Sequence, residues 1–198
     1  MSAHAIPHRV NNPRIFRRVY LGSGEGEEPL REAKRKRGKI AMVDPVYRRH
    51  WHKPALFTPF IKQGIHVHAG TYRTFFREMI RNRQRASSFF LTMPQYTLSS
   101  NGSSLRRSRV FDAQLIDLIR TLPKVLTLNG KLVVTTDYSS VIELFSNNAP
   151  SHGLIMSWPT KLSERDIRNG SRDTQDMGLV EKSRIYRFTV KRKLLRKN

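Results

Sequence analysis

The chain has 198 residues, a length that fits one α/β domain. It carries 37 Lys and Arg residues against 15 Asp and Glu residues, a formal net charge of +22. An excess of this size repels itself, and a polyanionic partner neutralises it with salt-sensitive affinity. The absence of cysteine excludes disulfides and thiolate metal sites. The basic residues are scattered and do not line one amphipathic helix, which argues against a membrane-surface protein.

Short apolar runs alternate with helical patterns along the chain, an order typical of a mostly parallel sheet in an α/β fold. Strands are expected at residues 18–21, 40–43, 64–68, 87–92, 131–137, 154–158 and 185–190. Helices are expected at residues 27–37, 71–85, 110–126 and 139–145. Residues 46–63 show no clear period and leave room for one short helix, and Asn129-Gly130 predicts a turn. We expect one domain over residues 18–192, between a basic N-terminal arm at 1–17 and a basic C-terminal tail at 193–198.

A glycine-rich turn separates the first expected strand from the first expected helix. Gly22, Gly24 and Gly26 permit a sharp turn and a close approach of a ligand to the backbone. Asp44 ends the second expected strand, twenty residues beyond Gly24, where an acid can accept hydrogen bonds from ribose hydroxyls. These four residues are the candidate cofactor-binding residues, and the alternative is a tight turn with a surface aspartate. Dinucleotides and S-adenosylmethionine share this geometry, but the Gly-x-Gly-x-Gly spacing is closer to the methyltransferase form.

Three segments resemble the tRNA (guanine-N7) methyltransferase family. Residues 19–27 resemble its cofactor loop, and residues 185–192 resemble its closing strand. The family's basic pair and long helix resemble Arg106-Arg107 and the helix expected at 110–126. Its glycine turn and T-D-x-Y strand end resemble the stretch from Leu128 to Tyr138. The resemblance covers residues 14–193. It implies an α/β, Rossmann-like class I methyltransferase fold with a mostly parallel seven-stranded sheet and helices on both faces.

The sequence departs from the family where the family carries acids. Tyr20 stands near the acid that precedes the glycine loop, and Ala69-Gly70-Thr71 has no acid after the third strand. Residues 92–96 contain no carboxylate, whereas the family has a motif similar to F-P-D-P-W there. Residues 174–176 match the family's T-x-x-E pair only roughly. Guanine N7 has a free lone pair and no proton to lose, so methyl transfer there needs orientation more than a general base. Because these acids are missing, we expect no catalytic residue and no cofactor. If the protein is active, the expected cofactor is S-adenosylmethionine.

Basic clusters lie at both ends of the chain and within the expected fold. Structured RNA is the polyanion that this distribution favours, with rRNA ahead of tRNA. A DNA-binding regulator is disfavoured because no helix-turn-helix or zinc signature is present. His66 and His68 share one face of the third strand without further ligands nearby in the sequence, so no metal site is expected. The candidate RNA-binding residues are Arg14, Arg17, Arg18, Lys34, Arg35, Lys36, Arg37, Arg106, Arg107, Arg109, Lys191, Arg192, Lys193, Arg196 and Lys197.

The high positive charge and the absence of the family's acids together predict an RNA-binding protein with a degenerate methyltransferase fold. It would be a structural or assembly component of a ribosome. Its further partners would be neighbouring ribosomal proteins, and no membrane is expected. The first 18 residues carry arginines and no acid, which favours a mitochondrial over a cytoplasmic location. Pro7 and Pro13 would break the helix of a targeting segment, and an extended basic arm fits these residues equally well. The alternative function is an active S-adenosylmethionine-dependent RNA methyltransferase of the tRNA guanine-N7 type.

Overall fold

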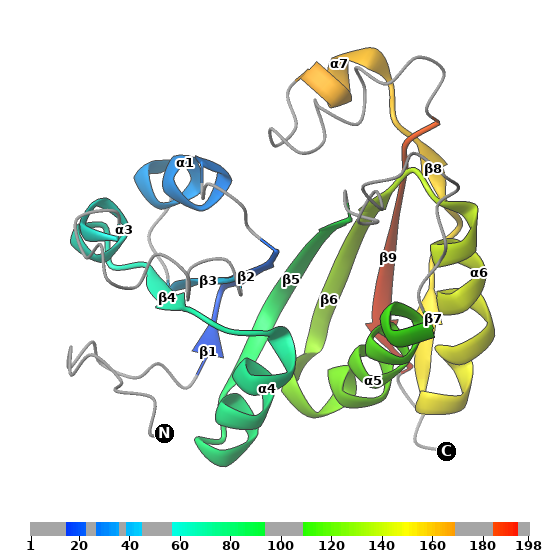
Figure 1. Cartoon of the computed structure of the whole chain (residues 1–198), viewed down its shortest axis with the longest axis horizontal. Helices are drawn as coiled ribbons and strands as arrows, with labels where there is room; N and C mark the ends of the chain where they lie inside the picture. Colours follow the sequence, from blue (N-terminus) through cyan, green and yellow to red (C-terminus); the bar gives the residue numbers. More distant parts are fainter. Residues whose placement is uncertain are drawn as a thin grey trace.

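The computed structural model describes residues 15–22, 27–35, 39–44, 57–93, 109–168 and 184–193, which form one sheet between two layers of helices (Figure 1). The strands are β1 (Ile15–Phe16), β2 (Arg18–Leu21), β3 (Ile40–Val43), β4 (His66–His68), β5 (Arg85–Met93), β6 (Leu126–Thr136), β7 (Leu154–Met156), β8 (Thr160–Lys161) and β9 (Tyr186–Arg192). The helices are α1 (Glu27–Arg35), α3 (Thr58–Lys62), α4 (Tyr72–Arg81), α5 (Arg109–Val125), α6 (Ser139–Asn148) and α7 (Glu164–Arg168), with a 3-10 turn at Pro150–His152.

Seven strands form a continuous path in the order β4-β3-β2-β5-β6-β9-β7. The strands from β2 to β6 are parallel, whereas β9 is antiparallel to both β6 and β7. β1 pairs with the start of β5, and β8 pairs with β9. Parallel strands such as β3 are continuous apolar runs because both faces of such a sheet are covered. The path confirms the predicted mostly parallel, seven-stranded sheet.

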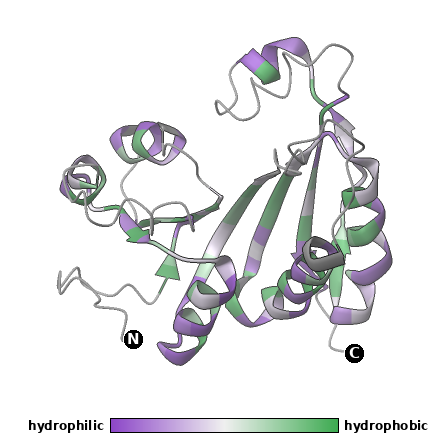
Figure 2. Cartoon of the chain, viewed as in Figure 1, coloured by the Kyte–Doolittle hydropathy of each residue, from purple (hydrophilic) through white to green (hydrophobic). Residues whose placement is uncertain are grey.

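Helices cover both faces of the sheet, as predicted. Side chains of α4, α5 and α6, including Phe76, Leu118 and Phe145, form one core cluster with alternate residues of the strands. α1 and α3 cover the other face, where Leu30 and Phe60 pack in a second cluster. Successive strand residues point to opposite faces, which is why the two clusters share the strands but no side chain. Figure 2 shows the mixture of polar and apolar residues that this packing requires on α4 and α6. None of the helices that the structure describes is long and apolar enough to cross a membrane.

The expected elements are present, but several of their ends differ. β2 and β3 have the predicted bounds. Gly64 lies before β4, because its φ of 71° turns the chain out of α3. The helix expected to reach Arg85 ends at Arg81, since Arg83 adopts a φ of 53° and the backbone nitrogen of Gln84 donates to the carbonyl of Met79. Two short elements, β8 and α7, were not expected from the sequence.

Two further differences affect the sheet itself. The turn expected at Asn129-Gly130 is wrong, because these residues lie within β6. The ladder is irregular there, since Ala86 pairs with Leu126 while Ser88 pairs with Lys131. β1 pairs with β5 and lies inside the segment assigned to a basic arm, so the sheet begins earlier in the chain than residue 18. The rest of the arm, and the tail after Lys193, lie outside the described residues.

Candidate active site

The carboxyl ends of the parallel strands meet at one edge of the sheet. β2 lies in the middle of this edge, with β3 on one side and β5 on the other. The chain runs outward from β2 to β3 and β4, then returns to β5, so the strand order reverses beside β2. In open α/β sheets, ligands bind in the crevice outside such a switch point. Residues that follow the ends of β2 to β6 therefore form the candidate site.

Gly22 and Asp44 are neighbours at this edge. The backbone nitrogen of Gly22 donates to the carbonyl oxygen of Val43 at 2.8 Å, and Asp44 is the next residue. Gly22 has a φ of 69°, a left-handed conformation that glycine adopts without a steric penalty. Asp44 is only 6% exposed, so it is not the surface aspartate of the alternative interpretation. Gly24 and Gly26 lie outside the described residues.

Tyr20, near the place where the resemblance led us to expect an acid, belongs to β2. Its ring is buried in the second core cluster with Ile40 and Met42. It stacks on Phe90, with ring centroids 5.1 Å apart and an interplanar angle of 19°. Burial raises the pKa of Tyr20, so its hydroxyl remains protonated at neutral pH. This position therefore contributes a neutral, packed ring to the structure and no carboxylate to the site.

The stretch Ala69-Gly70-Thr71, which has no acid, directly precedes α4 and ends at its N-cap residue, Thr71. The hydroxyl of Thr71 accepts a hydrogen bond from the backbone nitrogen of Thr74 at 3.3 Å and caps the helix. His68 Nε2 lies 2.9 Å from the hydroxyl of Thr74, and a hydrogen bond from His68 lowers the pKa of Glu78. The histidine is thus held by helix residues. In the described segments, no group of three His, Asp or Glu side chains is arranged to hold a metal ion.

The end of β6 supplies polar groups that were not among the predicted site residues, although the resemblance included this strand end. Asp137 follows β6, and its Oδ1 atom is buried without a hydrogen-bond partner. Burial raises the pKa of Asp137. On the adjacent strand β9, the Nε atom of Arg187 donates to the hydroxyl of the buried Thr135 at 3.3 Å. The charge of Arg187 also acts on Glu28, in the first turn of α1, whose pKa is raised by burial. A carboxylate oxygen without a hydrogen-bond partner therefore lies just after β6, at the carboxyl edge of the sheet.

Asp137→Asn is expected to stabilise the isolated protein at neutral pH. The pKa of Asp137 is raised in the folded state, so ionisation at neutral pH costs folding free energy and protonation at low pH removes that cost. Relieving one partly buried, unpaired carboxylate is worth about 1 kcal/mol, which corresponds to an increase of roughly 2–4 °C in Tm for a chain of this size. Thermal unfolding of the wild-type and Asp137→Asn proteins at neutral pH measures this gain in Tm. The same measurement at the lowest pH where both proteins fold should show that the difference in Tm disappears.

Asp166→Asn is the matched control. The hydroxyl of Ser163 donates to Asp166 at 2.6 Å, and this hydrogen bond lowers the pKa of Asp166. The same substitution should therefore lower Tm at neutral pH. An Asp137→Asn protein that also unfolds at a lower temperature would contradict the burial of an unsatisfied carboxylate at this edge.

The predicted RNA-binding residues differ in their surroundings. Arg17 and Arg18 both pair with Glu32 of α1, at 2.9 and 3.3 Å, and are partly buried. Lys34, Lys191 and Lys193 are exposed, Arg192 is partly buried, and the backbones of Arg35 and Arg109 belong to α1 and α5. The assignment of these residues to RNA stays a prediction. The others, which lie outside the described residues, are Arg14, Lys36, Arg37, Arg106, Arg107, Arg196 and Lys197.

Several solved methyltransferases share this arrangement of strands and helices. No family model and no curated protein sequence matches the chain. The 16S rRNA methyltransferase KamB aligns with a TM-score of 0.59 at 12% identity, over 93% of this chain and 89% of its own. An antibiotic-related methyltransferase gives a TM-score of 0.59 at 14% identity, over 90% of this chain and 86% of its own. An rRNA methylase from Streptococcus thermophilus gives 0.55 at 6% identity, over 90% and 87%. At such identities the likeness concerns the fold, and the chain has the Rossmann-like fold of class I methyltransferases.

Proposed function

We propose that the chain is an S-adenosylmethionine-dependent RNA methyltransferase. The observation that carries this proposal is the position of Gly22, which donates a hydrogen bond to Val43, beside the buried Asp44 outside the switch point of the sheet. A left-handed glycine that opens a turn and an acid at the end of the next strand are the two features that a nucleoside cofactor requires at this edge. This differs from the expectation of a non-catalytic ribosomal component, which the lost acids favoured.

The described residues fit the nucleoside half of the cofactor. Asp44 would accept hydrogen bonds from the ribose hydroxyls, and Gly22, which has no Cβ, would let the ligand approach its backbone closely. The cofactor, when bound, supplies an electrophilic methyl group. Asp137 offers an unpaired oxygen that would accept a hydrogen bond from the acceptor nucleotide and orient it. Guanine N7, the acceptor that the family resemblance implies, has a lone pair and needs no base to remove a proton.

RNA is the proposed substrate class because of charge. A net charge of +22 favours a polyanionic partner, and the exposed residues Lys34, Lys191 and Lys193 lie on α1 and at the end of β9. Phosphate contacts with such residues release counterions and provide affinity without regard to sequence. The rRNA methyltransferases among the structures of the same fold support this class. We propose structured RNA, with rRNA and tRNA as the candidates.

A second candidate function is an RNA-binding protein without catalysis. The burial of Tyr20 favours it, since the place of a cofactor-binding acid is filled by a ring stacked on Phe90. In that case the protein would be a structural or assembly component of a ribosome, and a mitochondrial ribosome is favoured. The glycine turn would then remain as part of the fold only.

Asp44→Asn separates the two candidates. A hydrogen bond to a charged acceptor contributes about 1.5–3 kcal/mol, so S-adenosylmethionine affinity should fall by about tenfold to a hundredfold. Isothermal titration calorimetry measures the affinity, and transfer of labelled methyl groups to rRNA and tRNA measures the activity. Glu143→Gln, an exposed carboxylate on α6, is the control that should change neither. A wild-type chain that binds no cofactor and methylates no RNA would leave the second candidate in place of the first.

A further inference from the structure

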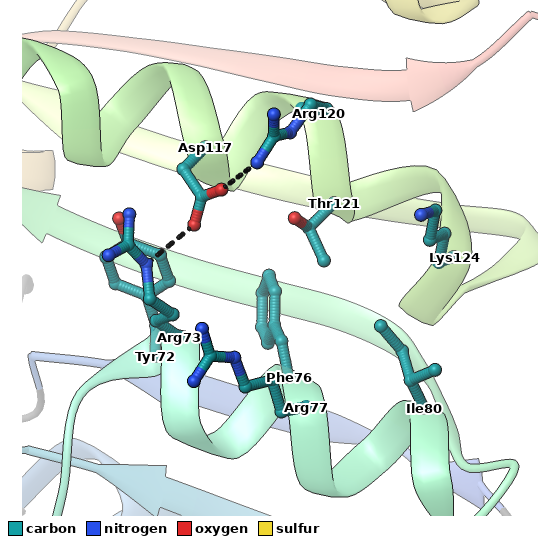
Figure 3. Close-up of a pocket in the computed structure, with 9 residues that line it drawn as sticks. All are labelled: Tyr72, Arg73, Phe76, Arg77, Ile80, Asp117, Arg120, Thr121 and Lys124. Carbon is teal, nitrogen blue, oxygen red and sulfur yellow. Dashed lines mark hydrogen bonds and ion pairs between the residues drawn. The ribbon is translucent and has the colours of Figure 1, made fainter.

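A groove between α4 and α5 lies on the face of the sheet opposite α1 and α3 (Figure 3). Its volume is about 600 Å³. The ring of Phe76 is buried between the two helices, and Ile80, at 43% exposed, lies further along the groove. None of the predicted RNA-binding residues lines it.

The two helices run in the same direction along the groove. Near its start, the hydroxyl of Tyr72 donates to the backbone carbonyl of Gln114, and Arg73 pairs with Asp117. Near its end, Ile80 of α4 and Lys124 of α5 both line the groove. Because α4 follows the carboxyl end of β4, the start of the groove is the part nearer the candidate active site. The groove therefore leads away from the carboxyl edge, parallel to the strands.

The cations of the groove form two successive pairs. Arg73 of α4 and Arg120 of α5 form the first pair, and both bind Asp117, at 2.9 and 2.6 Å. Arg77 and Lys124 form the second pair, four residues further along each helix. Four residues of an α-helix rise about 6 Å. Each wall thus presents two positive charges one helical turn apart, and the cations of α5 lie further along the groove than those of α4 (Figure 3).

The groove carries a large excess of positive charge. Asp117 is its single carboxylate among the lining residues, against Arg73, Arg77, Arg120 and Lys124. Burial opposes the ionisation of Asp117, but hydrogen bonds from Arg73 and Arg120 outweigh it and lower its pKa. The two arginine side chains remain 48% and 66% exposed, so N–H groups that Asp117 does not use are open to solvent. Within the described residues, neither Arg77 nor Lys124 has an acidic partner at ion-pair distance.

We propose that the α4–α5 groove binds the phosphodiester backbone of the RNA substrate. A strand of RNA presents negative charges at regular intervals, which matches two rows of cations spaced along parallel helices. Arginine forks bind phosphate oxygens bidentately, and Asp117 fixes two of these forks against the helices. The choice of RNA over an acidic protein rests on the proposed function and on the net charge of the chain. The groove would hold a segment of RNA beside the nucleotide that enters the carboxyl edge.

The test is RNA binding by the full chain in the absence of cofactor. Arg77→Glu/Lys124→Glu reverses the unpartnered pair, and Arg31→Glu/Lys62→Glu reverses two exposed cations on α1 and α3, across the sheet. Both variants carry the same net charge, so the difference between them reports on the groove. We expect the groove variant to bind a structured RNA at least about tenfold more weakly than the control, and the slope of log K against log salt to fall by roughly one to two, as lost phosphate contacts require.

The neutral variant Arg77→Gln/Lys124→Gln should weaken binding in the same direction, and circular dichroism establishes that each protein is folded. Equal RNA affinities for the groove and control variants would overturn the proposal, even if methyl transfer by the wild-type chain supports the proposed function. Displacement of RNA by poly-glutamate at equal charge concentration would also overturn it, in favour of an acidic protein partner. A third outcome is that the groove variant binds RNA more weakly than the control while the wild-type chain transfers no methyl groups. That result would support RNA binding in the groove and contradict the proposed enzymatic function.

Discussion

Deletion of residues 182–198 is expected to abolish the cooperative folding of the domain. The deletion removes β9, which pairs with β6 from Lys131–Lys191 to Thr136–Tyr186 and separates β6 from β7. Phe188 and Val190 of β9 are buried in the main core cluster, and Phe188 packs edge-on against Phe145 of α6. Loss of one large buried aromatic costs about 3–5 kcal/mol, out of a total stability of about 5–15 kcal/mol. The loss of a whole internal strand exceeds this reserve.

Thermal unfolding followed by circular dichroism measures the effect, and a deletion of residues 194–198 is the control. The control retains all of β9 and should unfold cooperatively near the temperature of the full chain. A 182–198 deletion with the same unfolding transition as the full chain would show that β9 is not part of the sheet.

RNA affinity is expected to fall by orders of magnitude with added salt. The charge of +22 and the cations of the proposed α4–α5 RNA groove would provide several phosphate contacts. A protein that makes 6–10 such contacts loses about 10³–10⁵ in affinity between about 50 and 200 mM salt. Fluorescence anisotropy with a labelled structured RNA measures the dependence. Binding that changes less than about tenfold over this range would contradict an interface built on phosphates.

The succession of strands along the chain was predictable because apolar runs with turn residues at their ends leave few alternatives. β2 and β3 are short β-branched or apolar runs followed by glycine or by Asp44-Pro45, and their bounds were predicted correctly. The end of α4 was not predictable, because Arg83 adopts a positive φ that no glycine signals. β1 was missed because two residues carry no period.

The candidate site was only partly visible in the sequence. Gly22 and Asp44 follow strand ends and were identified by spacing. The hydrogen bond between Thr135 and Arg187 joins residues more than fifty positions apart, and no local pattern records it. The groove cations were overlooked for the same reason, since Arg77 and Lys124 belong to different helices that become neighbours only through packing on the sheet.

The position of β9 has a consequence for synthesis of the chain. β9 is made after β6 and β7, yet it lies between them in the sheet. Until β9 emerges, β6 has an open edge toward the place of β9, and β7 is separated from the sheet. Open strand edges are templates for pairing with other chains, and contacts that must wait for distant residues slow folding. Before β9 is made, the open edge of β6 therefore makes the nascent chain prone to aggregation. A chaperone that covers β6 at this stage would prevent such pairing.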